Sequence, residues 1–409
     1  MRVTIDRLGQ HGDGIAIGEA GPIYAPGLLP GEVAEGDLDG DTLGNIRILS
    51  PSSDRVKPPC SHAKACGGCL MQHAGDAFVA DWKQDILRVA LSGQGLSAPF
   101  LETVTSAAQS RRRATITGRK TKTGVLMGFH TRGTDTLIPV PNCQLLHPDL
   151  IAGFPGLEGL VKLGSTRTTE IQMTITRSAS GLDVSVTGGK RLDAAMRMDL
   201  ARVIEANSFA RLTWSGETVA LRAPPQQRFG RANVTPPPGA FLQATADGEA
   251  ALLRAVKLAV GPARRIVDLF AGCGTFALPL AEAAEVHAVE SEAPMMAALE
   301  KGARAIEGLK KVTVAARDLF RRPLEPDEFK GFDAVVIDPP RAGAEAQMKC
   351  LAIARVPVIA AVSCNPITFA RDAKILVDAG YRLDWVQVID QFRWSSHVEL
   401  AAKFSMPKS

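Results

Sequence analysis

The chain has 409 residues, more than one hydrophobic core normally organises, so two or three domains are expected. Its composition, with 45% apolar and 22% charged residues, is that of an ordinary globular protein. No apolar stretch is long enough to span a bilayer or to act as a secretory signal, so we expect neither a membrane protein nor a secreted one but a cytoplasmic one. The net charge of +4 permits a nucleic-acid partner without requiring one.

Residues 1–55 are expected to form the first domain. Short apolar runs alternate there with glycines, as between Gly12 and Ile17, which is typical of a small β-barrel with tight turns. A linker bounded by prolines, residues 51–59, follows. Apolar side chains then recur at helical spacing, which predicts an amphipathic helix at residues 76–91 whose apolar face could pack on the catalytic domain.

Residues 56–235 are expected to form a β-rich central domain. Polar and apolar residues alternate at 170–176 and 182–186, as in half-buried strands, and the prolines at 236–238 end the domain. Between Thr103 and Thr134 the sequence has no acidic residue but many basic ones, from Arg111 to Arg132. Two interpretations stay open for this basic stretch, a solvated charged face of a strand pair or a set of phosphate contacts.

Residues 236–409 alternate between buried strands and helices. Short apolar runs at 265–270, 286–290, 333–338 and 358–363 are separated by helical stretches. Continuous apolar strands of this kind predict an α/β domain with a parallel, doubly wound, Rossmann-like sheet, whose ligands lie at the carboxyl ends of the strands.

The first strands of this sheet carry features of a nucleoside-binding site. Strand 265–270 leads into a glycine loop, Gly272-Cys273-Gly274-Thr275, where the backbone can approach a ligand closely. The second strand ends in Glu290, which could accept hydrogen bonds from ribose hydroxyls. A dinucleotide enzyme would share these features, but the loop lacks the Gly-x-Gly-x-x-Gly pattern. Asp318 follows the third strand, and an Asp338-Pro-Pro turn typical of methyltransferases of planar bases follows the fourth.

The fifth strand delivers Cys364 to the same edge of the sheet, before an Asn-Pro turn. A buried cysteine is more often inert packing, but this position favours chemistry. Addition of a thiolate at C6 of uracil makes C5 reactive toward a sulfonium methyl group, and a base must then remove the C5 proton. Glu399, near the C-terminus, is the candidate base, and a strand-edge ion pair is the alternative for it.

Cys60, Cys66 and Cys69 form a Cys-x5-Cys-x2-Cys run, and Cys143 lies far downstream. Four thiolates can bind zinc or hold an iron–sulfur cluster, and spacing alone does not choose between them. The five-residue gap is wider than in most zinc knuckles, which favours the cluster. Cys273 and Cys350 are interpreted as small buried apolar residues.

Taken together, these motifs resemble the RNA uracil-5-methyltransferases over nearly the whole chain. The similarity rests on the sequences around Cys364, on Asp338 to Gly343 and on His397-Val398-Glu399. It implies a Cys364 nucleophile, a Glu399 base and a [4Fe-4S] cluster on the four cysteines. It also implies an S-adenosylmethionine site made of Gln243, Phe270, Thr275, Glu290, Asp318 and Asp338. Residues 1–55 resemble the oligonucleotide-binding barrel called TRAM.

The chain departs from the resembled family at two positions near these motifs. Thr245 stands where members often have Asn, and Arg393 stands where they have Pro. These departures put the details of target binding in doubt and leave the expected reaction unchanged.

The resulting prediction is a monomeric enzyme that methylates C5 of a uridine in RNA, with 23S ribosomal RNA favoured over transfer RNA by association with family members. The target would have to be flipped out to reach Cys364. A methyltransferase of exocyclic amines would leave Cys364 and Glu399 idle. A non-catalytic RNA-binding iron–sulfur sensor would leave the chemistry at the strand ends unexplained.

Overall fold

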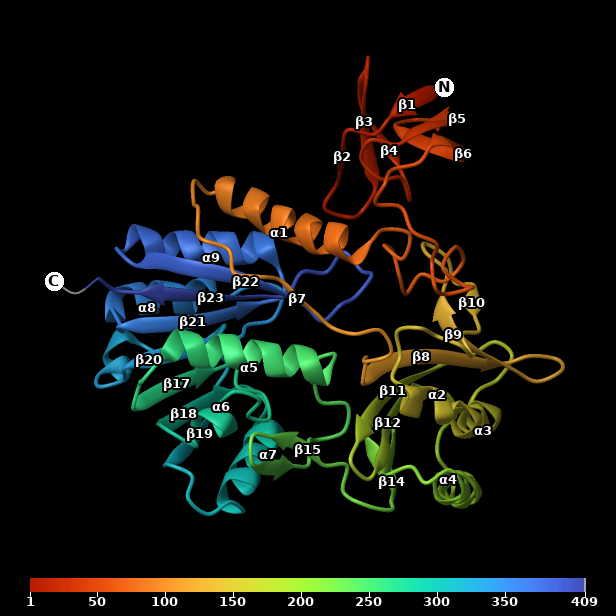
Figure 1. Ribbon diagram of the computed structural model, residues 1–409. Coiled ribbons are helices and arrows are strands. Elements are labelled where there is room, and N and C mark those ends of the chain that lie inside the picture. The colour runs from red at the N-terminus through yellow and green to blue at the C-terminus, as the bar shows by residue number, and fades with distance from the viewer. Residues whose placement is uncertain (408–409) are drawn as a thin grey trace.

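The computed structural model describes residues 1–407, and three parts of the chain are distinct in it (Figure 1). The N-terminal part is a sheet of short strands in the order β1-β5-β6-β4-β3-β2. Its core is small and includes Ile5, Ile23 and Leu43. Glycine at position 14, the first residue of β3, lets the backbone pass close to the carbonyl oxygen of Leu28, because a Cβ there would lie only 2.9 Å from that atom. The strands are β1 (Arg2–Thr4), β2 (Arg7–Leu8), β3 (Gly14–Gly18), β4 (Gly21–Ala25), β5 (Val33–Asp39) and β6 (Thr42–Ser50).

The helix expected at residues 76–91 is present as α1 (Asp76–Ser92). Its buried face includes Val79, Leu87 and Leu91, and the helix packs against α9 and β22 of the C-terminal part. Strand β7 (Val104–Thr105) then pairs in parallel with β22. The segment from α1 to β7 therefore lies with the C-terminal sheet, although it precedes the central sheet in the sequence (Figure 1).

The central part is a sheet in the order β10-β9-β8-β11-β12-β13-β14, and it also carries helices. The strands predicted at 170–176 and 182–186 are β11 and β12, which pair as a hairpin. Helix α3 packs on the sheet through Leu157, Leu160 and Val161. These helices were not predicted from the sequence, because glycines interrupt α3 and the flanking strands dominate the pattern. The elements are β8 (Arg113–Lys120), β9 (Val125–His130), β10 (Leu137–Ile138), α2 (Pro148–Ala152), α3 (Phe154–Gly164), β11 (Ile171–Ser178), β12 (Gly181–Gly188), α4 (Ala194–Ala206), β13 (Arg211–Trp214) and β14 (Glu217–Leu221), followed by the hairpin of β15 (Gln227–Phe229) and β16 (Ala232–Val234).

The C-terminal part contains the predicted Rossmann-like sheet, with strand order β19-β18-β17-β20-β21-β23-β22-β7. Strands β17 to β21 are mutually parallel, whereas β23 runs antiparallel between β21 and β22. The predicted parallel arrangement of the strands at 265–270, 286–290, 333–338 and 358–363 is confirmed, and the antiparallel β23 is a feature that was not predicted. The elements are α5 (Ala246–Val260), β17 (Arg265–Leu269), α6 (Ala277–Leu280), β18 (Glu285–Glu290), α7 (Ala293–Arg304), β19 (Val312–Ala316), η1 (Pro326–Phe329), β20 (Ala334–Ile337), α8 (Glu345–Ala354), β21 (Val358–Ser363), α9 (Pro366–Asp378), β22 (Arg382–Asp390) and β23 (Leu400–Ser405).

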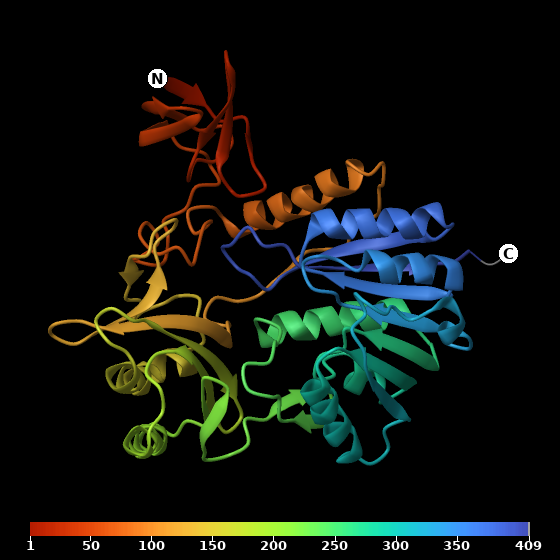
Figure 2. The same ribbon diagram turned by 180° about the vertical axis from the view of Figure 1, so that it is seen from behind.

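Helices cover both faces of this sheet, as the two opposite views show (Figures 1 and 2). Side chains of α5, α6 and α7 form one apolar layer with the sheet, and those of α1, α8 and α9 form the other. None of the helices in residues 1–407 combines the length and apolarity needed to cross a membrane. The two layers hold the strands rigidly, so the residues at the strand ends are fixed relative to one another.

Candidate active site

The carboxyl edge of the C-terminal sheet gathers the predicted catalytic residues. Strand β20 ends one residue before Asp338, and the neighbouring β21 ends one residue before Cys364. Because β23 is antiparallel to β21, its first residue Leu400 pairs with Ser363. Glu399, which precedes Leu400, therefore lies at the same edge as Cys364. The antiparallel strand, which periodicity did not reveal, is what brings the C-terminal glutamate to the cysteine.

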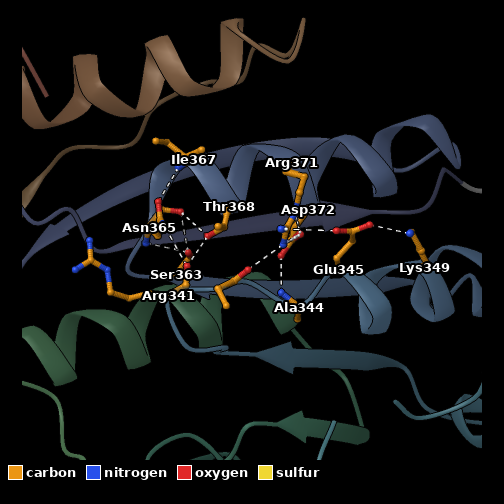
Figure 3. A network of polar contacts seen from close by, with 11 residues as sticks. Arg341, Ala344, Glu345, Lys349, Ser363, Asn365, Ile367, Thr368, Arg371 and Asp372 are labelled. Atoms are coloured by element: carbon orange, nitrogen blue, oxygen red, sulfur yellow. Dashed lines mark hydrogen bonds and ion pairs between the residues drawn. The ribbon is translucent and has the colours of Figure 1, made fainter. Parts of the chain in front are cut away.

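A polar network fixes the turn that carries Cys364 (Figure 3). Asn365 caps helix α9 by accepting a hydrogen bond from the Ile367 amide, and its own amide group donates to the carbonyl oxygen of Arg341 (3.0 Å). Asp372 of α9 accepts from the Ala344 amide (2.7 Å). Both contacts join α9 to the segment that follows Asp338. The nucleophile turn and the Asp-Pro-Pro turn are thus tied together as one unit.

A second network of two glutamines links Asp338 to Glu399. Gln391 donates from Nε2 to Gln243 Oε1 (2.5 Å) and to Glu399 Oε2 (3.2 Å), and its Oε1 accepts from a backbone amide. Gln243 in turn donates to Asp338 Oδ2 (3.2 Å). Gln243, Gln391 and Glu399 are each at most 3% exposed. The sequence analysis did not identify Gln391, because a glutamine that follows a strand carries no motif of its own.

The two carboxyl groups of this site have strongly shifted pKa values. Burial raises the pKa of Asp338 to about 7, and the bond from Gln243 partly opposes this. Burial, and then the charge of Asp338, raise the pKa of Glu399 well above its ordinary value. Within residues 1–407 the side chain of Glu399 is hydrogen-bonded to Gln391 and forms no ion pair with a cation, which favours the interpretation as a base over that as a strand-edge ion pair. Carboxyl groups in such surroundings are suited to proton transfer near neutral pH.

Cys364 is half-buried and carries a free thiol. Burial, and then repulsion by Glu399 and Asp338, raise its pKa to about 11, and Arg341 opposes this shift. The thiolate is therefore disfavoured while both carboxylates are charged. A bound substrate that neutralises or shields them would favour the thiolate.

Three of the residues predicted to hold the cofactor, Phe270, Glu290 and Asp318, lie at or just after the ends of β17, β18 and β19. Gly272 has φ +54°, and a Cβ there would meet no other atom within 4 Å, so the loop leaves open space beside it. The Gly272 amide donates to Glu290 (3.2 Å), which also accepts from the Ser291 amide (2.6 Å). Asp268 lies beneath the loop, fully buried, and neither carboxylate oxygen has a hydrogen-bond partner within residues 1–407. Burial, and then Asp338, raise its pKa well above the ordinary value.

The remaining predicted cofactor residues are more dispersed. Phe270 has φ +60°, a strained conformation for a non-glycine residue, and its ring lies 5.5 Å from that of Phe320. Asp318 accepts from the Phe320 amide (3.0 Å) beside this aromatic pair. Thr275 instead borders a cavity between α5 and the central part. Glu290, Phe270 and Asp318 thus share the open edge near the glycine loop, whereas Thr275 lies at its margin.

The four predicted cluster ligands, Cys60, Cys66, Cys69 and Cys143, line one cavity of about 640 Å³. All four have free thiols, and backbone amides donate to the sulfur atoms of Cys60 and Cys66 (3.4 Å each). Burial, and then the neighbouring cysteines, raise the pKa of Cys69 to about 11. No group of three or more His, Cys, Asp and Glu side chains in residues 1–407 is arranged to hold a metal ion. The donor chemistry suits a metal centre, but the sulfur atoms do not surround one.

The basic stretch divides between two roles. Arg112 forms a buried ion pair with Glu249, and Arg119 pairs with Glu170, so these arginines are structural. Arg111 and Arg113 face the cysteine cavity, and the Arg111 guanidinium lies 5.7 Å from the centre of the Phe392 ring. Only a part of this stretch is therefore available for phosphate contacts.

Comparison with known proteins places the chain in a family. The family model "tRNA (Uracil-5-)-methyltransferase" matches residues 235–405. An RNA methyltransferase of Mesorhizobium japonicum is 42% identical over the whole chain and 98% of the relative. The 23S rRNA (uracil(1939)-C(5))-methyltransferase RlmD of Vibrio cholerae is 31% identical over 98% of this chain and 95% of its own.

Among solved structures, the tRNA (uracil-54, C5)-methyltransferase of Pyrococcus abyssi, in complex with S-adenosyl-L-homocysteine, has a TM-score of 0.76 at 24% identity and covers 99% of both chains. This likeness concerns the fold of the whole chain. The sequence matches extend over the same length and include the edge of the sheet described above. The chain belongs to the RNA uracil-5-methyltransferases, enzymes that take their methyl group from S-adenosylmethionine.

Proposed function

We propose that this enzyme methylates C5 of a specific uridine in 23S ribosomal RNA, with Cys364 as nucleophile and Glu399 as base. The observation that carries the proposal is the meeting of Cys364, Asp338 and Glu399 at one edge of the sheet, through the pairing of Ser363 with Leu400. A thiol and a buried carboxyl group with a raised pKa are the two groups that C5 methylation needs. A methyltransferase of exocyclic amines would use neither.

The proposed reaction begins when Cys364 Sγ adds to C6 of the uracil and the ring electrons move to C5 and O4. S-adenosylmethionine, when bound, supplies an electrophilic sulfonium methyl group. C5 forms the new carbon–carbon bond to that methyl group as the bond between the methyl carbon and the sulfonium sulfur breaks, and the sulfur keeps the electron pair and leaves as a thioether. Glu399 then takes the C5 proton, the C5–C6 double bond reforms, and the carbon–sulfur bond breaks to release the Cys364 thiolate. Gln243 and Asp338 offer a donor and an acceptor, which suits the amide edge of a pyrimidine or the cofactor.

For the methyl donor, we propose a site made by Gln243, Phe270, Thr275, Glu290, Asp318 and Asp338. The open space beside Gly272 supports a ligand at this loop. Glu290 and Asp318 offer acceptor oxygens to ribose hydroxyls and to an adenine amino group. The Phe270 ring provides an apolar surface for the base.

The raised pKa values predict a distinct dependence of activity on pH. Glu399 must be ionised to accept the proton, and burial raises its pKa, so the turnover number is expected to rise with pH at values well above the ordinary pKa of a glutamate. Because the charge of Asp338 raises the pKa values of both Glu399 and Cys364, Asp338→Asn should move this rise to lower pH. The control Asp318→Asn changes a carboxylate of the proposed cofactor site, and it should leave the midpoint of the pH profile unchanged. If the turnover number rises at the same pH in Asp338→Asn as in wild type, Asp338 does not control the pKa values of Glu399 and Cys364.

We propose that Cys60, Cys66, Cys69 and Cys143 hold a [4Fe-4S] cluster with a structural or RNA-positioning role, since methylation needs no electron transfer. Their shared cavity and the amide donors to Cys60 and Cys66 support this. Protein purified without oxygen should absorb near 400 nm and contain about four irons, and Cys66→Ser should lose both. The control Cys350→Ser, outside the cavity, should keep them. Protein that contains zinc and no iron would contradict the proposed iron–sulfur cluster and identify zinc, the less favoured occupant, as the bound metal.

We further propose that residues 1–55 form a TRAM-type barrel that contacts RNA, that 56–235 are the cluster-bearing central domain and that 236–409 are the catalytic domain. The small strand-rich N-terminal sheet, which projects from one end of the molecule and packs on Met71 and Trp82 through Leu29, supports the first assignment (Figure 1). Single strands and loops are the usual ligands of such barrels. We expect the enzyme to act as a monomer in the cytoplasm.

The choice of RNA can be tested directly with purified enzyme. We expect label from methyl-labelled S-adenosylmethionine to enter 23S rRNA from a strain that lacks this protein, and nuclease digestion to release it as 5-methyluridine. Transfer RNA is the second candidate, because the structural relative from Pyrococcus abyssi is named for a tRNA uridine. Label in transfer RNA alone would overturn the ribosomal target, and label in another nucleoside would overturn the reaction.

A further inference from the structure

Glu399 lies at the end of the loop formed by residues 391–399, between β22 and β23. Residues from outside the catalytic domain hold this loop in place. Lys83 of helix α1 is completely buried, and its Nζ donates to Asp390 Oδ1 (2.6 Å) and to the carbonyl oxygen of Phe392 (3.2 Å). Asp390 is 1% exposed. The lysine thus joins the last residue of β22 and the second residue of the loop from a position more than 300 residues earlier in the chain.

Two further contacts from the same segment hold the middle of the loop. Arg393 pairs with Asp76, the first residue of α1 (2.5 Å). The amides of Leu70 and Met71 both donate to the carbonyl oxygen of Trp394 (2.6 and 3.0 Å), a residue with φ +60°. Residues 70–83 therefore clamp the loop at three points.

The clamp is connected directly to the base. Gln391 lies in the sequence between Asp390 and Phe392, the two residues that Lys83 binds, and it donates to Glu399 Oε2. The Ile389 amide donates to the Glu399 carbonyl oxygen (2.8 Å). A shift of Asp390 or Phe392 would therefore move both partners of Glu399. Desolvation makes a buried ion pair a poor source of stability, which favours a role in fixing one arrangement of the loop.

We infer that Lys83 is a positioning residue that holds the 391–399 loop so that Glu399 reaches the C5 proton. This inference rests on the proposed role of Glu399. In the step concerned, Glu399 takes the C5 proton, the electrons of the C5–H bond form the C5–C6 double bond, and the C6–Sγ bond breaks. Addition of Cys364 and methyl transfer precede this step and require no proton transfer to Glu399.

The test separates this step from the earlier ones in a single turnover with methyl-labelled cofactor. Lys83→Met leaves Asp390 buried and unpaired, so the double variant Lys83→Met/Asp390→Leu is the decisive protein, because an apolar pair can replace a buried ion pair without loss of stability. We expect the labelled covalent protein–RNA adduct to form at the wild-type rate in both variants. Its breakdown to free RNA should slow on the order of 10- to 100-fold, the usual effect of a misplaced catalytic group. Lys374→Met, an exposed lysine of α9, is the control and should behave as wild type.

The variant Glu399→Gln, measured in the same experiment, distinguishes failure of the inference about Lys83 from failure of the proposed role of Glu399. If Glu399→Gln stalls at the adduct but the double variant, with an unchanged melting temperature, resolves it at the wild-type rate, the role of Lys83 is overturned. Equal losses in adduct formation and breakdown would also overturn it, since they would indicate a merely structural ion pair. If Glu399→Gln itself resolves the adduct normally, the proposed base is wrong and the inference falls with it.

Discussion

Replacing Cys364 by serine is expected to reduce methylation by on the order of 10⁴- to 10⁶-fold, the range seen when a covalent nucleophile is removed from an enzyme. A serine hydroxyl is much less acidic than a thiol and does not add to C6 at a useful rate. The substitution changes one atom at a half-buried position outside both apolar layers. Binding of S-adenosylmethionine, measured by calorimetry, should therefore be retained.

RNA with 5-fluorouridine at the target gives this prediction a direct readout. Fluorine at C5 cannot leave as a proton does, so wild-type enzyme with cofactor should be trapped as a covalent complex with methylated RNA, visible on a denaturing gel. Cys364→Ser should give no such complex. Cys350→Ser, which changes another half-buried thiol on α8, should be trapped like wild type. Trapping of Cys364→Ser would show that another group attacks C6.

The sequence contained most of what decides the catalytic fold. Apolar strands that each end in a polar residue predicted β17, β18, β20 and β21, and the structure brings their ends to one edge. The helix at 76–91 was recognised because its apolar residues recur with one clear period. Cys364 and Asp338 could be placed together because parallel strands share their carboxyl edge. These successes all rest on local patterns that tertiary structure does not alter.

The features that the sequence did not reveal depend on contacts between distant segments. Nothing local shows that β23 inserts between β21 and β22, although this insertion delivers Glu399. Lys83 appears as an ordinary polar residue of an amphipathic helix, and only the tertiary fold buries it against Asp390. Gln391 acquires its importance from two partners, one of them nearly 150 residues away. The same holds for the basic stretch, where the structure pairs Arg112 with Glu249.

Glu399→Gln is expected to stop the reaction after methyl transfer. Glutamine has the shape of glutamate and can still accept the hydrogen bond from Gln391, so the loop should keep its arrangement. It cannot take a proton, and removal of a general base lowers the rate of the step that it serves by about 10²- to 10⁴-fold. Addition of Cys364 and methyl transfer need no such base. The variant should therefore accumulate methylated RNA joined to Cys364.

This adduct distinguishes the base from a residue that only shapes the site. With unmodified RNA and methyl-labelled cofactor, label should remain with the Glu399→Gln protein on a denaturing gel, whereas wild-type enzyme releases it as free RNA. Glu345→Gln, which alters a solvent-facing carboxylate of the network in Figure 3, should release its product normally. Loss of the neighbouring charge should also lower the pKa of Cys364, because Glu399 raises it, so the adduct should form at lower pH than in wild type. Release of free product at the wild-type rate would show that water or another group takes the C5 proton, and Glu399 would then have no catalytic part in the reaction.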